Sequence, residues 1–410
     1  MSHSAGLADF RAALTTPGAR GPVLTSLLAR MPIAMVGLSL LLYVQRESGS
    51  FAVAGFVSAG SLIGVAIGAV AQGRIMDRLG PTRPLLVASG LFVMTVTAVI
   101  VTIESGQTGP ALVAMGWLIG LTEPMVGSAS RALWTHLVPA GPIRHAAFAY
   151  EAISLEVFFI LGPALAGILV AAPWSGTGLV FSAACMVVGG VGFALTSAVR
   201  SVRPAPSSGG HLLGALATPG MRTVALAALG FGVTVGFVEV AIPAAATNAG
   251  HAPLGGVMLA AWSLTSVVFG VYYAARPWPR QMGLRLPFLL GMFALFVIPL
   301  AITSNLLWLA LLSLVAGMWI TPQSTTHSTA IELVAPEGTA TEAFGWIVTA
   351  VTLGLAAGQS TSGYLVEHVG VWSAFVAAGL AGLVIAGLVL VRRHTVVEQH
   401  APAPELVAVS

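Results

Sequence analysis

A small set of ionisable and polar residues lies inside long apolar segments of this sequence. Only 8% of its 410 residues are charged, against about 25% in soluble domains. An ionisable group at the centre of a bilayer costs about 2.5–3.5 kcal/mol on insertion scales, so each one needs a reason to be there. Two kinds of chemistry suit such groups, namely proton transfer and the binding of a polar solute. The residues concerned are Arg30, Glu123, Arg131, Glu151, Glu156, Glu239, Gln323 and His327.

Three carboxyl groups are candidates for proton coupling: Glu123, Glu239 and Glu156. Burial disfavours the charged form of a carboxyl group, so a buried one tends to hold its proton until water reaches it. Glu123 and Glu239 have no evident partner nearby in the sequence, and each could instead bind substrate or simply stay protonated. Glu156 precedes the pair Gly162-Pro163, and it could hydrogen-bond to backbone groups that the proline frees.

Arg30, Arg131 and Glu151 fall at similar depths in their segments, on the side expected to be cytoplasmic. They could therefore form ion pairs that stabilise the fold, or they could face a substrate. Glu123, Gly127 and Arg131 are spaced four residues apart, which places them along one face of a helix.

Gln323 and His327 share a helix face in the same way, within a polar run from 321 to 329. His327 could be a packed histidine among hydroxyl groups or a contact for substrate. The residues predicted to line a substrate cavity are Arg30, Glu123, Arg131, Glu239, Gln323 and His327.

Twelve apolar segments must position these residues. The chain is 57% hydrophobic, and a helix that crosses a bilayer needs about 20 predominantly apolar residues. We therefore predict an all-α integral membrane protein with twelve transmembrane helices in two pseudo-symmetric six-helix bundles. The predicted helices are 23–44, 50–72, 84–103, 110–134, 146–171, 175–199, 221–247, 253–275, 286–303, 305–331, 341–366 and 371–391.

The arginines predict the orientation of these helices. An even number of spans puts both termini on one side, and fourteen of the seventeen basic residues fall on that side. Only Arg46 falls on the other side, so the positive-inside rule predicts that both termini are cytoplasmic. The basic residues are scattered singly without a nucleic-acid motif, so we expect a multi-pass protein of the cell membrane and no nucleic-acid partner.

A polar stretch rich in Pro, Ser and Gly divides the spans six and six. The predicted parts are a cytoplasmic N-terminal segment 1–22, a bundle 23–199, a cytoplasmic linker 200–220, a second bundle 221–391 and a cytoplasmic tail 392–410. The halves also echo each other, because Pro124, Pro139 and Phe148 recur as Pro322, Pro336 and Phe344 at offsets of 198, 197 and 196 residues. Repeated halves are a usual plan for secondary transporters, with the binding site at their interface.

Several classes of function lack support in the sequence. The single cysteine, Cys185, excludes an intramolecular disulfide and a cysteine-based metal cluster. No phosphate-binding loop, metal-ligand spacing or nucleophile motif occurs. We therefore expect no enzyme activity, no cofactor and no metal, and we expect the partners to be a small-molecule substrate, protons and the lipid bilayer.

The charged stretch 73–83, read here as a loop between the second and third spans, resembles a signature of the major facilitator superfamily. That signature is Gly-x-x-x-Asp-Arg-x-Gly followed by basic residues, and it matches Gly73, Asp77, Arg78, Gly80 and Arg83. The two residues after Gly80 depart from it, because the family often has a basic residue directly there. The resemblance covers roughly residues 20–395.

Two further motifs resemble the same family. Gly162, Pro163 and Gly167 are similar to the end of a helix 5 motif found in its proton-coupled exporters, although Ala166 replaces one glycine. Arg131 is similar to an arginine that the family carries in helix 4. The resemblance implies that helices 1, 4, 7 and 10 line a cavity, and that helices 3, 6, 9 and 12 are peripheral.

The resemblance also implies a role for Asp77. It would face the start of helix 11 near Thr339–Thr341, where a helix N-terminus favours negative charge. With the other residues of the signature it would form a conformational latch that holds the halves shut on the cytoplasmic side in the outward-open state. Glu342 lies close by and would weaken this contact unless an arginine intervenes. The alternative is that the arginines of this stretch only fix the orientation of the chain in the membrane.

We therefore predict a monomeric secondary transporter that exports a drug-like or amphiphilic compound in exchange for protons. One alternative is a proton-coupled importer of a sugar or organic anion, with Arg30 and Arg131 binding the anion. Another is a membrane sensor or assembly partner that transports nothing.

Overall fold

The computed structural model describes residues 6–48, 51–107, 109–170, 172–204, 213–276, 278, 281–303 and 305–396. All regular secondary structure in these ranges is helical. Twelve spans are long and apolar enough to cross a membrane, as the sequence predicted. The chain is thus a multi-pass membrane protein.

The first half holds a short helix α1 and six spans. The elements are α1 (Leu7–Thr15), α2 (Arg20–Arg30) with α3 (Ile33–Ser48), α4 (Phe51–Leu79), α5 (Thr82–Glu104), α6 (Pro110–Thr122) with α7 (Val126–Leu137), α8 (Pro142–Val170) and α9 (Thr177–Leu195), followed by the short α10 (Ser197–Ser201).

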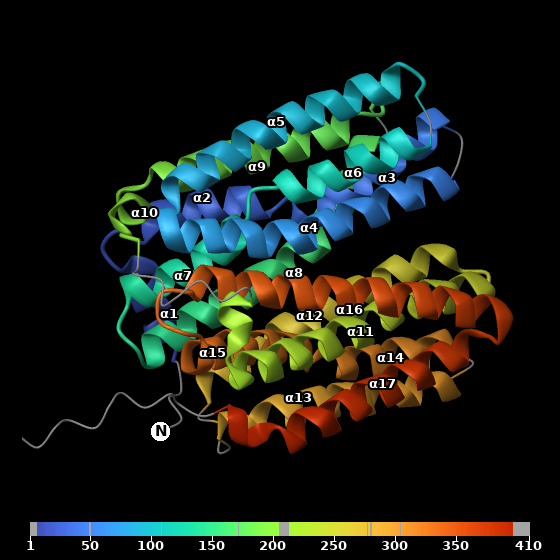
Figure 1. Cartoon of the computed structure of the whole chain (residues 1–410). Helices are drawn as coiled ribbons and strands as arrows, with labels where there is room; N and C mark the ends of the chain where they lie inside the picture. The colour runs from blue at the N-terminus through green and yellow to red at the C-terminus, as the bar shows by residue number, and fades with distance from the viewer. Residues whose placement is uncertain are drawn as a thin grey trace, which may run out of the picture.

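The second half repeats this plan. After a 3-10 turn at Gly214–Ala217 come α11 (Pro219–Asn248), α12 (Ala252–Ala275), α13 (Met282–Val297) with a 3-10 turn at Ile298–Ile302, α14 (Leu306–Gly317) with α15 (Ile320–Val334), α16 (Ala340–His368) and α17 (Val371–Val391), and a final 3-10 turn at Arg393–Thr395. Figure 1 shows the halves as two layers of helices lying one above the other.

Three spans are broken near a proline. The first breaks between α2 and α3 at Met31-Pro32, and the fourth breaks between α6 and α7 at 123–125. The tenth breaks between α14 and α15, just before Pro322. A helix interrupted inside a membrane leaves backbone groups that need partners, which is tolerated where the backbone is buried in protein or lines a cavity.

Gln72 of α4 supplies such partners for the break in the fourth span. Its amide nitrogen donates to the carbonyl oxygens of Leu121 (3.1 Å) and Glu123 (2.8 Å), and its amide oxygen accepts from the backbone nitrogen of Met125 (3.1 Å). This single side chain therefore fixes the geometry at Glu123.

The two halves meet mainly at one end. There α4 packs against α16, and α8 packs against α12 and α15. One apolar cluster at this end draws on both halves, and its aromatic residues include Phe148 and Phe344, whose ring centroids are 6.1 Å apart. The large clusters nearer the other end each belong to a single half.

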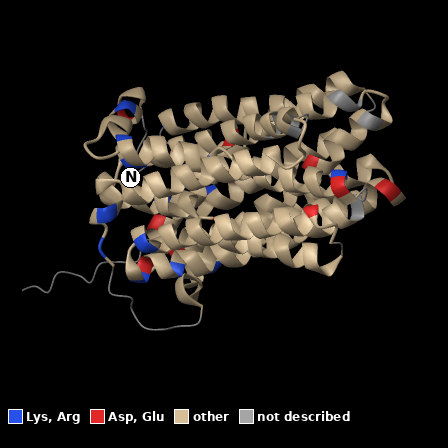
Figure 2. Cartoon of the chain, turned by 90° about the horizontal axis from the view of Figure 1, so that it is seen from above, with Lys and Arg blue, Asp and Glu red and all other residues tan. Residues whose placement is uncertain are grey.

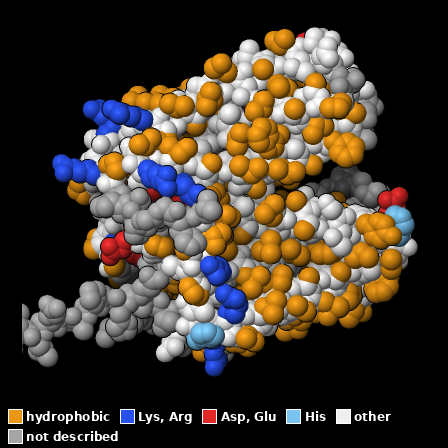
Figure 3. Space-filling view, in the orientation of Figure 1, with side chains coloured by type: hydrophobic (Ala, Val, Ile, Leu, Met, Phe, Trp, Pro, Cys, Tyr) orange, Lys and Arg blue, Asp and Glu red, His pale blue; other side chains and the backbone are white. Residues whose placement is uncertain are grey.

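The end at which the halves meet is also the end at which most of the arginines lie (Figure 2). We call it the arginine-rich end, and it is the end expected to face the cytoplasm. Figure 3 shows the halves in contact there and separated by a notch at the opposite end. The molecule is therefore closed at the arginine-rich end and open at the other.

The charged stretch 73–83 is not a loop. Helix α4 continues to Leu79, seven residues beyond the predicted end of the second span, and α5 begins at Thr82. The turn is only Gly80-Pro81, with Gly80 at φ 79°, a left-handed conformation that favours glycine at a helix end. Hydropathy locates the edge of the membrane, whereas this helix extends past it.

The N-terminal segment 1–22 also holds more structure than the sequence indicated. Its helix α1 packs against α8, and Phe10 lies on a small cluster of Ala146 and Ala149 from α8 and Ala274 from α12. Helix α1 therefore touches both halves where they meet at the arginine-rich end.

Candidate transport site

A buried ion pair joins the first span to α8. Arg30 donates from its guanidinium to the carboxylate of Glu151 and to the Glu151 carbonyl oxygen (2.9 Å). The other Glu151 oxygen accepts from Ser130 (2.8 Å) and from the indole nitrogen of Trp134 (2.9 Å). Glu151 is fully buried and both of its carboxylate oxygens accept hydrogen bonds, so this cluster holds the first, fourth and fifth spans together.

Arg131 stands next to this pair without joining it. Its Nε atom is buried and has no hydrogen-bond partner, and no ion pair of Arg131 occurs among the described residues. The guanidinium is close enough to Arg30, Glu151 and His327 for their charges to interact. The interpretation of Arg30, Arg131 and Glu151 as ion-paired thus holds for the first and last only.

Glu123 lies at the break in the fourth span, near the middle of the membrane. Its residue is 7% exposed, and its carboxyl group has no hydrogen-bond or ion-pair partner within the described part of the chain. Helix α7, with 12 residues and a rise of about 18 Å, separates this break from the arginine-rich end. Gln72 holds its backbone, so the side chain is positioned although it is unpaired.

Glu156 and Glu239 belong to opposite halves of the molecule. Glu239 of α11 is half-buried and accepts a hydrogen bond from the amide of Gln359 on α16 (2.9 Å). Glu156 of α8 is buried, lies beside Ser263 of α12, and is close enough to Glu239 for the two carboxyl groups to repel when both are ionised. Glu156 therefore contacts the opposite half rather than only backbone near Pro163.

Gln323 and His327 interact on α15, as their spacing predicted. The Gln323 amide nitrogen and His327 Nε2 are 3.1 Å apart, and the His327 ring packs edge-on against Phe231 of α11. Both residues are buried, but Gln323 Oε1 has no hydrogen-bond partner. This face of α15 therefore offers one free acceptor beside the histidine.

The expected contact of Asp77 is present at the arginine-rich end. Its carboxylate accepts hydrogen bonds from the backbone nitrogens of Thr341 (3.0 Å) and Glu342 (2.7 Å), the first turn of α16. Arg74 forms an ion pair with Glu342 (2.7 Å), and this arginine offsets part of the repulsion expected there. Ala215, at the end of the linker, also donates its backbone nitrogen to Glu342 (3.1 Å).

The residues around Asp77 differ in what they do. Arg78 and Arg83 are exposed and have no ion-pair partner among the described residues, whereas Gly73 packs against α16. Arg74 was not among the predicted site residues, although it lies one turn before Asp77 and the need for an arginine near Glu342 pointed to it. Whether this contact works as a latch stays a prediction.

A model of the Major Facilitator Superfamily matches residues 23–358, which is most of the chain. The chain belongs to the major facilitator superfamily. It is a transporter of this family rather than an enzyme. A search of curated proteins gives no match.

Solved structures of other facilitator proteins share the fold at low sequence identity. The human organic anion transporter MFSD10 is 19% identical with a TM-score of 0.67, over 91% of this chain and 99% of that one. A bacterial homologue of the iron transporter ferroportin in an outward-facing state is 14% identical with a TM-score of 0.72, over 92% and 98%. The E. coli fucose:proton symporter is 13% identical with a TM-score of 0.65, over 92% and 98%.

The helix 5 motif of this facilitator protein falls within α8. Gly162 packs against Ala34 and Met35 of α3, where an added Cβ would lie 3.0 Å from Ala34. The surroundings of Pro163 and Gly167 lie outside the described part of the structure. The motif therefore joins the first and fifth spans, and its role stays a prediction.

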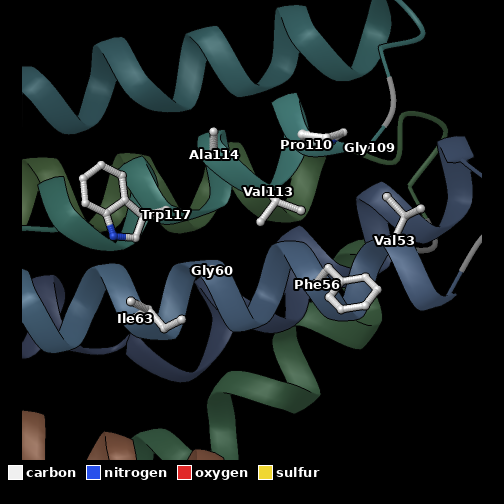
Figure 4. A pocket seen from close by; sticks show the side chains of 9 residues that line it. All are labelled: Val53, Phe56, Gly60, Ile63, Gly109, Pro110, Val113, Ala114 and Trp117. Atoms are coloured by element: carbon white, nitrogen blue, oxygen red, sulfur yellow. The ribbon is translucent and has the colours of Figure 1, made fainter.

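A cavity of about 670 Å³ opens between α4 and α6, away from the candidate residues. Figure 4 shows it lined by apolar side chains such as Phe56, Ile63, Val113 and Trp117. None of the charged or polar candidates contributes to its wall. This cavity has no means of binding a charged solute, so it is not the predicted substrate cavity.

Proposed function

We propose that this facilitator protein couples the movement of a small molecule to protons by alternating access in the cell membrane, with the arginine-rich end in the cytoplasm. The proposal is based on a difference in ion pairing among the carboxyl groups of the chain. Glu151 and Glu342 have arginine partners, whereas Glu123, Glu156 and Glu239 have no cationic partner among the described residues. A carboxyl group without a counter-ion is stable in such a place when it can take up a proton.

Glu156 and Glu239 are the pair best placed for coupling. They belong to opposite halves, so their charge state acts on the contact between those halves. Two ionised carboxylates repel each other across the interface, and one bound proton removes that repulsion. Glu239 is also only half-buried, so part of the residue is accessible to solvent.

The direction that we propose is export of a drug-like or amphiphilic compound. Support comes from the resemblance of the stretch 162–167 to the motif of proton-coupled exporters. The second candidate is a proton-coupled importer of a sugar or organic anion, which the unpaired Arg131 favours. Accumulation of the compound in cells, in place of resistance to it, would favour the importer.

The test uses proteoliposomes with an imposed pH gradient and a compound selected by thermal-shift screening of the purified protein. Glu239→Gln and Glu156→Gln are expected to abolish gradient-driven movement while leaving exchange of the compound across the membrane at equal pH. Glu123→Gln tests the third carboxyl group in the same assay. Glu332→Gln, at the arginine-rich rim, is the matched control and should keep coupling. Full coupling in all three interior variants would remove these residues from the mechanism.

A further inference from the structure

The guanidinium of Arg131 is an interior charge that has no counter-ion among the described residues. Its Nε is buried without a partner, and it lies near the paired Arg30 and Glu151 rather than bonded to them. Removing one partner of a buried ion pair is strongly destabilising because the other charge is left uncompensated, and the half-buried guanidinium of Arg131 carries a penalty of the same kind. A residue that imposes such a cost on the fold needs a compensating role.

The charges around Arg131 do not cancel. Arg30 and Arg131 contribute two positive charges at this depth, and Glu151 contributes one negative charge, already held by Arg30. One positive charge therefore remains at the inner end of the region between the halves. Ala132, the residue after Arg131 on α7, belongs to the same buried cluster as Ala330, which lies one turn after His327 on α15. A ligand beside Arg131 would therefore lie between the two halves, with Gln323 bonded to His327 on the same helix.

We propose that Arg131 binds the anionic group of the transported compound, a carboxylate or phosphonate, in a subsite completed by His327 and Gln323. The inference rests on the proposed transport function and adds to it the chemical class of the substrate. The planar guanidinium matches a carboxylate with two parallel hydrogen bonds. Gln323 Oε1, which lacks a partner, accepts a hydrogen bond from a hydroxyl or N–H group on the same compound.

A subsite of this kind suits alternating access. Arg131 belongs to α7 in the first half, and His327 belongs to α15 in the second half. An anion between them neutralises Arg131 and gives the two halves a shared ligand. The empty protein retains the unpaired charge, so ligand binding relieves a cost that the fold otherwise carries.

The test compares matched pairs of compounds that differ in charge and little else. The probes are indole-3-acetate with indole-3-acetamide, and 4-hydroxybenzoate with 4-hydroxybenzamide. Their binding to the purified protein is measured by calorimetry and by the shift in unfolding temperature at constant ionic strength. We expect each acid to bind roughly tenfold or more tightly than its amide, the scale of a charge-assisted hydrogen bond.

Variants at position 131 decide whether this preference comes from Arg131. Arg131→Gln and Arg131→Met are expected to bind acid and amide equally, and Arg131→Lys should keep part of the preference. Arg200→Gln, an exposed arginine of α10, is the control and should bind as the unaltered protein does. Without ligand, Arg131→Met should unfold at the same or a higher temperature, whereas a structural role for Arg131 would lower it.

The outcomes separate this inference from the proton-coupling proposal. If acids stabilise the protein no more than amides, whether both bind or neither does, the anion subsite is wrong. A preference that survives in Arg131→Gln would also overturn it. An acid preference that depends on Arg131, in a protein without gradient-driven movement, would keep the subsite and reject proton coupling.

Discussion

The arginine-rich end and the centre of this facilitator protein differ in whether their charged groups have bonded partners. At the arginine-rich end, Asp77 accepts two backbone N–H groups, and Arg74 and Arg144 pair with Glu342 and Glu332. In the centre, Glu123 and Arg131 have no bonded partner among the described residues. Charged groups with bonded partners join the halves at one end, and charged groups without them lie in the centre.

The difference follows from what each region must do. The contacts at the closed end must break in every transport cycle, so their strength has to stay moderate. A charge-assisted hydrogen bond contributes about 1.5–3 kcal/mol, and about 5.5 kcal/mol turns a 1:99 population into 99:1. The two hydrogen bonds of Asp77 are therefore of the size that a ligand or a proton can overcome.

The largest expected effect comes from the one central charge pair that is fully satisfied. Glu151→Gln leaves Arg30, 3% exposed, without its counter-ion, and we expect a loss of stability of about 3–5 kcal/mol. The measurement is thermal unfolding and the monodisperse yield in detergent. Glu332→Gln, which removes a more exposed carboxylate, serves as the control.

A double variant sharpens this first prediction. Replacing both charges with apolar side chains, Arg30→Met with Glu151→Met, should recover much of the lost stability because no buried charge is left alone. An unchanged unfolding temperature in Glu151→Gln would show that the centre tolerates unpaired charge everywhere, and the contrast between the two regions would disappear.

A smaller effect is expected at the closed end from Asp77→Asn. The amide keeps only one acceptor oxygen and loses the charge, so one hydrogen bond to the first turn of α16 weakens toward the neutral value and the other is lost, because the amide NH2 group cannot accept from a backbone N–H. Opening of the arginine-rich end should become roughly tenfold more frequent. The readout is labelling of Ala147→Cys, a buried position of the cluster shared by both halves, by a maleimide in a Cys185→Ser background.

Arg78→Gln is the matched control for Asp77→Asn. Arg78 follows Asp77 directly, but it is exposed and has no partner among the described residues, so labelling should stay at the original rate. Equal labelling of Asp77→Asn and the unaltered protein would count against a latch at this contact.

Gly73→Ala tests the same contact through packing. A Cβ at this position would lie 2.8 Å from the Thr341 carbonyl oxygen and 2.9 Å from the Glu342 Cα, both backbone atoms. Overpacking of this kind costs about 1–3 kcal/mol, so α4 and α16 should separate and labelling of Ala147→Cys should rise up to the level of Asp77→Asn.

Gly90→Ala controls for the added methyl group. Gly90 lies in α5, where an added Cβ would meet nothing within 4 Å, so its replacement should leave labelling unchanged. If Gly73→Ala behaves like Gly90→Ala, the close approach of α4 and α16 does not hold this end shut.

The sequence predicts the spans of this protein well and their ends less well. Apolar length alone places twelve helices, and the last one, 371–391, has the bounds that were predicted. The second span was predicted to end at 72 because hydropathy falls there, although α4 continues to Leu79. The break at Met31-Pro32 was not predicted, since proline within a membrane helix can bend it without ending it.

The contacts of the candidate site were also predicted only in part. Helical spacing brought Gln323 and His327 together, because both lie on one helix. The pairing of Arg30 with Glu151 and the isolation of Arg131 depend on packing between helices, about which spacing within one helix says nothing. The sequence around Gln72 did not indicate its role, because that role depends on a break in a different span.

The smallest effect is expected from Glu332→Gln at the rim of the closed end, because Arg144 keeps its hydrogen bonds to the carbonyl oxygens of Val138 and Thr135 in this variant. The ion pair of Arg144 with Glu332 is partly exposed to solvent, at 14% and 25%, and such pairs contribute about 0–1 kcal/mol. Salt screens them, so the unaltered protein at high ionic strength should label like the variant. Labelling of Ala147→Cys should rise by less than about fivefold. A rise as large as that in Asp77→Asn would place the strength of the closed end in its exposed ion pair, and the backbone contact of Asp77 would then be secondary.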